Sequence, residues 1–110
     1  MSAGRLPTPA EIADAHVAVR AHLPVSPLTE AAGLWWKRED LLPTGSFKVR
    51  GAVAALTGLS SEGCVAASAG NHGLGLAFAA GRLGRRVTIV VPRECPPVKR
   101  AKLAAAERVE

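Results

Sequence analysis

Residues 46–52, with the sequence SFKVRGA, place a lysine at a point where the pattern of the chain changes. Before them come a strand-like run at residues 34–39 and a turn at residues 40–45. After them, apolar residues recur at the three- and four-residue spacing of an amphipathic helix, at Val49, Ala52, Val53 and Leu56. The pattern therefore predicts a strand, a turn and a helix, with Lys48 in the first helical turn.

Lys48 stands in an unusual place for a structural lysine. The positive end of the helix dipole disfavours a cation at a helix start, and partial burial beside Phe47 would favour the uncharged amine. An uncharged amine is a nucleophile that can form a Schiff base with an aldehyde. The alternative is a solvated lysine at the start of a helix, which is the commoner situation because lysine is rarely buried.

A second motif, residues 68–73 with the sequence SAGNHG, follows an apolar strand pattern and opens another helical stretch. At such a turn the free N–H groups and the helix dipole favour an anion, and Gly70 and Gly73 let the backbone approach a ligand. No Gly-Lys-Ser/Thr follows, and Phe78 stands where a dinucleotide fingerprint has its third glycine. The residues alone leave two interpretations open, an anion site and a plain glycine-rich turn.

Together, residues 43–52 (PTGSFKVRGA) and residues 68–73 resemble the paired signature of serine/threonine dehydratases. These are pyridoxal phosphate (PLP) enzymes of the tryptophan-synthase-β-like fold, also called fold type II. The similarity extends from about residue 24 to the end of the chain. Two motifs in the right order are more specific than either motif alone.

The resemblance implies roles for individual residues. Lys48 would hold PLP through a Schiff base and act as the base at the substrate Cα, Phe47 would pack against the cofactor ring, and Asn71 would hydrogen-bond its phenolic oxygen. N–H groups of the second motif would hold the substrate carboxylate, at Ser68, Ala69, Gly70, Asn71 and His72. The implied reaction converts L-threonine or L-serine into a 2-oxo acid and ammonia. No metal is expected in the site.

Other positions in the motifs refine the resemblance. Val49 follows the lysine and His72 follows Asn71, whereas sulfhydrylases and cystathionine synthases of this fold tend to have aspartate and threonine there. Ala69 stands where serine racemases carry a second serine, so a racemase-like enzyme is an alternative with weaker support. His72 is equally well explained as a helix-start residue held by backbone contacts, and Arg50 is better explained by a structural ion pair.

In the family that the motifs resemble, the phosphate-binding loop and the partner of the pyridine nitrogen lie well downstream of residue 110. The resemblance therefore implies a single N-terminal part of a dehydratase domain, with a leading helix at residues 1–24 and truncated βα units at residues 34–110. Such a part is expected to be inactive alone, and its expected protein partner is a second copy of itself in a homo-oligomer or the missing C-terminal portion. A non-catalytic fragment that acts as an interaction partner is the alternative.

The remaining pattern predicts an α/β fold. Thr8, Pro9 and Glu11 form a capping box that starts a helix, Pro24 ends it, and residues 25–33 read as a connector. Strands then alternate with helices, with strands at 34–39, 64–68 and 87–91, helices at 48–58, 72–83 and 97–106, and the opening of a strand at 108–110. This alternation predicts a parallel sheet with helices on both faces.

The composition fits one globular domain, since 48% of the 110 residues are hydrophobic. The net charge is +5, but the basic residues are spread along the chain and no tyrosine accompanies them, so no nucleic-acid partner is expected. Cys64 and Cys95 fit no zinc or redox spacing and read as free thiols of a reducing compartment. Glycines and polar residues interrupt the uncharged run at 63–81, and no apolar leader is present, so we expect a cytoplasmic protein without a membrane partner.

Overall fold

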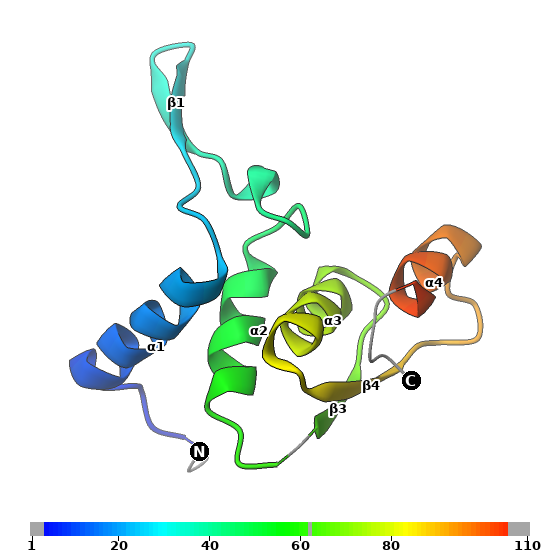
Figure 1. Ribbon diagram of the computed structural model, residues 1–110. Helices are drawn as coiled ribbons and strands as arrows, with labels where there is room; N and C mark the ends of the chain where they lie inside the picture. Colours follow the sequence, from blue (N-terminus) through cyan, green and yellow to red (C-terminus); the bar gives the residue numbers. More distant parts are fainter. Residues whose placement is uncertain (1–3, 62, 106–110) are drawn as a thin grey trace.

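The computed structural model describes residues 4–61 and 63–105. Its elements, in chain order, are α1 (Pro9–His22), β1 (Leu28–Ala31), β2 (Leu34–Lys37), the short 3-10 helix η1 (Glu39–Leu41), α2 (Lys48–Thr57), β3 (Gly63–Ala67), α3 (Asn71–Leu83), β4 (Arg86–Val90) and α4 (Pro97–Ala104) (Figure 1). The strand expected at residues 108–110 and the last residue of the final predicted helix lie outside the described residues. None of the helices in the described ranges is long and apolar enough to cross a membrane.

Helix α1 begins as the sequence predicts. Thr8 Oγ1 accepts a hydrogen bond from the Glu11 N–H at 3.3 Å, and the Glu11 carboxylate accepts one from the Thr8 N–H at 2.7 Å. Both halves of the capping box are therefore present, and Pro9 takes the first helical position, where its missing N–H costs nothing. Near its end, α1 buries Val19 and the following Leu23 in the core that it shares with α2.

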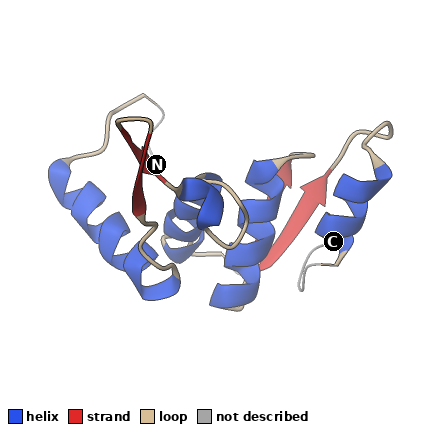
Figure 2. Ribbon diagram, turned by 90° about the horizontal axis from the view of Figure 1, so that it is seen from above, coloured by secondary structure: helices blue, strands red, loops and turns tan. Residues whose placement is uncertain are grey.

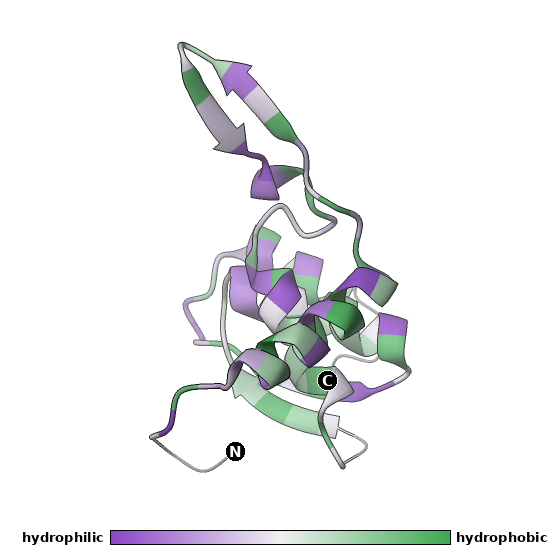
Figure 3. Ribbon diagram, turned by 90° about the vertical axis from the view of Figure 1, so that its left-hand side faces the viewer, coloured by the Kyte–Doolittle hydropathy of each residue, from purple (hydrophilic) through white to green (hydrophobic). Residues whose placement is uncertain are grey.

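The connector expected at residues 25–33 instead contains β1, which pairs with β2 in an antiparallel hairpin. Ala32 and Gly33 form the two-residue turn, with φ angles of 52° and 72°, the positive values that a hairpin turn of this length requires. Ala-Gly is a weaker hairpin signal than Asn-Gly, which is why the pattern alone does not indicate the turn. β2 therefore belongs to a hairpin that stands clear of the helices (Figure 3), and it does not join the parallel sheet.

β3 and β4 form the parallel pair that the strand–helix alternation predicts, and α3 is the crossover between them. Val87 and Ile89 of β4 are buried on one face, where α3 and α4 lie. On the other face, Val65 is 72% exposed and Val90 is 54% exposed. Within the described residues, helices therefore cover one face of the sheet, and the second face that we expected to be covered is open.

The core lies mainly between α2 and α3, which run side by side (Figures 1 and 2). Both helices contribute fully buried small and branched side chains, among them Val49, Val53, Leu56, Ala79 and Ala80. Small residues on α3 allow a short distance between the two helix axes. The fold thus fixes the start of α2 against α3.

Candidate active site

The two sequence motifs meet at the starts of two neighbouring helices. Lys48 is the first residue of α2, and Asn71 is the first residue of α3. One turn into α3, a Cβ on Gly75 would lie 3.2 Å from the carbonyl carbon and oxygen of Lys48, and 3.2 Å from the Cα of Val49. The N-terminal ends of the two helices are therefore neighbours, although most of α2 and the whole of β3 separate them in the chain.

The side chain of Lys48 is exposed, so the partial burial expected from the sequence is wrong for this structure. Its Nζ lies 5.2 Å from the centroid of the Phe47 ring, and Phe47 is itself 60% exposed. Among the described residues, no carboxylate lies within ion-pair distance of Nζ. Lys48 is exposed because Val49, not Lys48, occupies the side of the first turn of α2 that faces the core. The amine is thus accessible and rests over an aromatic ring in a cation–π contact.

Ser68 shapes the loop of the second motif. Its Oγ accepts hydrogen bonds from the N–H groups of Gly70 at 3.3 Å and Gly73 at 3.0 Å. The Ser68 N–H donates to the carbonyl of Val90 at 3.0 Å, which continues the β3–β4 ladder up to the loop. The hydroxyl of Ser68 and two of the loop N–H groups are therefore engaged within the protein.

The first N–H groups of α3 are available to a ligand. Asn71 and His72 occupy the first two helical positions, whose N–H groups have no carbonyl partner inside a helix. The N-cap residue, Gly70, offers no side-chain cap, and both Asn71 and His72 are exposed. Directed N–H donors at the positive end of a helix fit a small carboxylate. Ala69 adds no side-chain donor of its own.

Gly73 fixes where this loop stands in the fold. A Cβ on Gly73 would lie 3.0 Å from the carbonyl oxygen of Ser68, 3.3 Å from Leu103 Cδ2 and 3.4 Å from Ile89 Cγ2. The loop is therefore packed closely against β4 and α4, at the carboxyl end of β3. Ligands of parallel α/β sheets bind at that end of the strands.

Two buried hydroxyls lie in the turn that leads into Lys48. Thr44 Oγ1 and Ser46 Oγ are buried, and neither has a hydrogen-bond partner among the described residues. Buried hydroxyls are nearly always hydrogen-bonded, so this turn has unused hydrogen-bonding capacity beside the lysine. The accessible primary amine of Lys48 and the exposed Asn71 amide are groups that fit the aldehyde and the ring oxygen of PLP.

A partly buried network joins α2 to the base of the hairpin. Arg50 Nε and Nη2 donate to the two oxygens of the Glu39 carboxylate at 2.7 Å and 2.9 Å. Arg50 Nη2 also donates to Ser26 Oγ at 3.1 Å, and the buried Ser26 hydroxyl donates to Glu39. The Arg50 guanidinium, more than any other group, holds the pKa of Glu39 down at about 2. The structural ion pair predicted for Arg50 is confirmed, but its partners lie 11 and 24 residues away, where no local pattern indicates them.

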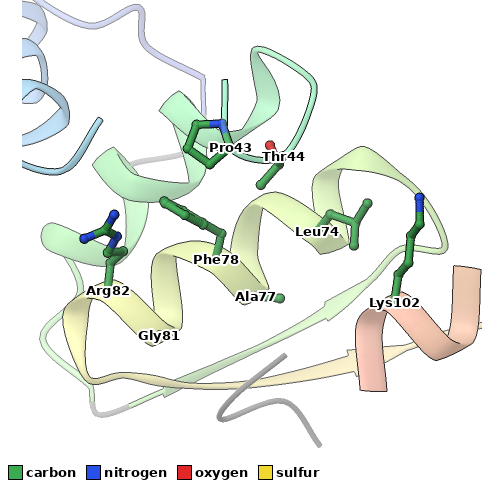
Figure 4. Close-up of a pocket in the computed structure, with 8 residues that line it drawn as sticks. All are labelled: Pro43, Thr44, Leu74, Ala77, Phe78, Gly81, Arg82 and Lys102. Carbon is green, nitrogen blue, oxygen red and sulfur yellow. The ribbon is translucent and has the colours of Figure 1, made fainter. Parts of the chain in front are cut away.

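A groove of about 750 Å³ runs along the outer side of α3 (Figure 4). Its lining residues are Pro43, Thr44, Leu74, Ala77, Phe78, Gly81, Arg82 and Lys102. The guanidinium of Arg82 lies 5.4 Å from the centroid of the Phe78 ring within it. None of the site residues predicted from the sequence lines this groove. The predicted site is instead an open surface formed by the two helix starts.

Comparison with known proteins supports the resemblance. The family described as pyridoxal-phosphate dependent enzyme matches residues 15–108. The biosynthetic L-threonine dehydratase IlvA of Haemophilus influenzae is 49% identical over 70 residues, which are 60% of this chain and 14% of that protein. The processed form of threonine deaminase isoform 2 from Solanum lycopersicum has a TM-score of 0.82 at 32% identity, over 92% of this chain and 32% of that chain. The serine racemase of Dictyostelium discoideum has a TM-score of 0.84 at 30% identity, over 91% of this chain and 37% of that chain.

These matches cover most of this chain but only a minor part of each relative, from 14% of the curated dehydratase to 37% of the solved racemase chain. The predicted α/β fold of type II PLP enzymes is confirmed by the solved structures. The resemblance of the chain to threonine dehydratases is confirmed by the curated relative. The match over residues 15–108 spans most of the chain, and the chain therefore belongs to the family of pyridoxal-phosphate dependent enzymes.

Proposed function

We propose that this chain supplies the lysine and the carboxylate-binding loop of a PLP-dependent dehydratase, which converts L-threonine or L-serine into a 2-oxo acid and ammonia. One observation carries the proposal. Lys48, whose amine is accessible, begins helix α2, and α2 is packed at Gly75 against α3, whose first N–H groups are available. The identity to a threonine dehydratase supports the same branch of the family.

Each residue of the two motifs has a role in this proposal. PLP, when bound, supplies the electron sink for breaking the substrate Cα–H bond. Lys48 would hold the cofactor aldehyde through Nζ, and the amine, once released, would take the proton from the substrate Cα. Phe47 would lie along the cofactor ring, and the amide of Asn71 would donate to the ring oxygen. The N–H groups of Asn71 and His72, in the loop shaped by Ser68, would hold the substrate carboxylate.

A serine racemase-like reaction is the second candidate, because a serine racemase shares the fold. Racemisation needs an acid that delivers a proton to the face of Cα opposite the lysine. Ala69 has no proton to give at the position where the resemblance places that acid. The alanine supports elimination over racemisation.

The 110 residues alone are expected to be inactive. The phosphate of PLP carries about two negative charges and needs several directed donors, whereas the free N–H groups described above are assigned to the substrate carboxylate. Trp35 of the hairpin is 70% exposed and Val65 lies on the open sheet face, so both surfaces suit a further polypeptide. We expect that polypeptide to be a further portion of the enzyme or a second copy of the chain. A cytoplasmic location stays a prediction.

The test uses a completed protein, meaning this chain fused to or co-expressed with the portion of a threonine dehydratase that the chain does not cover. The completed protein is incubated with PLP and reduced with borohydride, and the labelled residues are then identified by peptide mapping. We expect the pyridoxyl label on Lys48, with Lys37, Lys99 and Lys102 as internal controls and Lys48→Ala as the control variant. A label pattern that is unchanged in Lys48→Ala would contradict the proposal. If the completed protein assembles stably but binds no PLP, the result would favour the alternative in which the chain is a non-catalytic interaction partner.

A further inference from the structure

We infer that Glu39 and Arg50, together with Ser26, are positioning residues that fix the helix start presenting the Lys48 amine. The inference rests on the proposed function of Lys48. It extends that function from the lysine to the hydrogen-bonded network that holds α2. None of the three residues is assigned a contact with substrate or cofactor, so the network would act through α2.

The ion pair holds α2 on the side away from Lys48. Arg50 follows Lys48 by two residues, which places it about 200° around the helix. Its guanidinium makes a two-pronged contact with Glu39, at 2.7 Å and 2.9 Å, and such a contact fixes direction as well as distance. The two side chains are only 30% and 23% exposed. The pair is therefore better protected from water and salt than an ordinary surface ion pair.

The other end of the network is the base of the hairpin. Ser26 is 3% exposed, and its hydroxyl both accepts from Arg50 and donates to Glu39. The Lys37 ammonium donates to the carbonyl of Ser26, and the Arg38 N–H donates to the carbonyl of Pro27 at 2.9 Å. The chain segments before β1 and after β2 are thus both linked to the Glu39 carboxylate and the Arg50 guanidinium. The network therefore links the hairpin base to α2.

α2 also rests against α3, on the side of the buried Val49, which is about 100° around the helix from Arg50. The Gly75 contact lies at the backbone of Lys48 and Val49, so α3 and the ion pair hold the first turn of α2 from two different directions. Phe47, the N-cap residue, makes no side-chain capping bond that would anchor this turn independently. Without the ion pair, the first turn can tilt about the Gly75 contact and carry the Lys48 amine with it. Displacements of about 1 Å can reduce a reaction rate by up to about a hundredfold.

A neighbouring ion pair provides a matched control. Arg38 and Asp40 flank Glu39 and bond to each other at 2.6 Å and 2.8 Å, but the two residues are only two positions apart. They are 36% and 56% exposed, and their ion pair joins no other element to α2. Removing this pair changes charge in the same segment without releasing α2.

The experiment compares three changes in the completed protein: Glu39→Gln, Arg50→Lys and the exchange of both charges (Glu39→Arg with Arg50→Glu). The controls are Arg38→Gln and Asp40→Asn. We expect Glu39→Gln to lower both kcat for L-threonine and the borohydride-trapped label on Lys48 relative to Lys99 by about tenfold, with KM changed by less than about twofold. Arg50→Lys should lose less, the charge exchange should recover part of the loss, and the controls should behave as wild type.

The folded fraction of every variant is measured by circular dichroism under the labelling conditions. Label and kcat in Glu39→Gln equal to those of the two controls would overturn the inference. A loss that merely follows the unfolded fraction would overturn it as well, because the network would then be structural only. If Glu39→Gln does not fold, the label and kcat of Arg50→Lys and of the charge exchange are compared with those of the two controls instead. An absence of Lys48 label in the wild-type protein would instead refute the proposed function.

Discussion

Gly75 packs against the backbone of Lys48 across the α2–α3 interface, with less room than a side chain normally has. A Cβ on Gly75 would lie 3.2 Å from the carbonyl carbon and from the carbonyl oxygen of Lys48. These neighbours are backbone atoms, so no flexible side chain can move aside to make space. The distance between the two helices and the position of the proposed active-site lysine are therefore set by the same contact.

Gly75→Ala should destabilise the fold and disturb the lysine. We expect a loss of about 1 to 3 kcal/mol in the free energy of unfolding, the usual effect of adding a methylene-sized group to a close-packed contact. Urea unfolding of the chain measures it. Gly81→Ala is the matched control, because Gly81 lies on the same helix, is exposed and has nothing within 4 Å of its Cβ position.

The control should be neutral or stabilising by up to about 1 kcal/mol, since alanine is a better helix former than glycine. In the completed protein, Gly75→Ala should also slow the labelling of Lys48, whereas Gly81→Ala should not. Equal stability of the two variants would show that α2 and α3 separate without strain.

Because of the Glu39 carboxylate, we expect the folded chain to lose stability in acid. Arg50 lowers its pKa from an ordinary value of 4.5 to about 2 in the folded chain. The folded chain therefore binds fewer protons than the unfolded chain between these two values, so the contribution is complete above about pH 4.5 and is lost as the pH falls toward about 2. Because the side chain is 23% exposed, we expect a screened contribution of about 1 to 2 kcal/mol.

Urea unfolding at about pH 6 and about pH 3, in the wild-type chain and in Glu39→Gln, measures this contribution. The variant should lose less stability than the wild type between the two conditions. Glu11, whose pKa Arg5 also lowers to about 2, is present in both proteins, so its effect cancels in the comparison. The same pH dependence in both proteins would show that the Glu39–Arg50 pair adds no stability.

Patterns confined to neighbouring residues were sufficient to predict much of this fold. The capping box at Thr8, the helix that begins at Lys48 and the β3–α3–β4 unit each depend on periodicity and on end signals within a few residues. The α/β class follows from their alternation. These elements could be predicted because short-range patterns decide them.

Features that depend on distant partners could not be predicted in the same way. The pairing of β1 with β2 depends on a weak Ala-Gly turn, and Arg50 finds Glu39 and Ser26 only in the folded chain. The exposure of Lys48 depends on which side of α2 meets α3. The sequence shows glycines in α3 but does not show that Gly75, unlike Gly81, has backbone against it.

Ala69 predicts that the completed protein eliminates and does not racemise. A methyl side chain cannot deliver a proton to the second face of the substrate carbanion. Incubation with L-serine should therefore yield a 2-oxo acid, and chiral chromatography should find no appreciable D-serine. Ala69→Ser, which adds a hydroxyl at that position, is the variant in which D-serine is expected to rise. Appreciable D-serine from the unaltered chain would mean that another group supplies the proton, and the racemase-like reaction would then be preferred.

The 110-residue chain by itself should not catalyse the reaction. Its described N–H donors at the start of α3 are needed for the substrate carboxylate, and the N–H groups of Gly70 and Gly73 already donate to Ser68 Oγ. The PLP phosphate would have too few directed donors, so binding should be weak. The exposed Trp35 and Trp36 and the open sheet face carrying Val65 should also make the purified chain prone to associate.

The measurement follows 2-oxo acid formation from L-threonine and from L-serine, with PLP and the purified chain, against PLP alone. We expect equal rates with and without the chain, and at most slow labelling spread over Lys48 and the α4 lysines after borohydride reduction. Light scattering in the same samples reports association, and Lys48→Ala is the control for any turnover that is found. Turnover well above that of free PLP and absent in Lys48→Ala would show that these residues are sufficient for catalysis. The donors for the phosphate would then have to lie within this chain, and the turn holding the unpaired hydroxyls of Thr44 and Ser46 would be the first place to seek them.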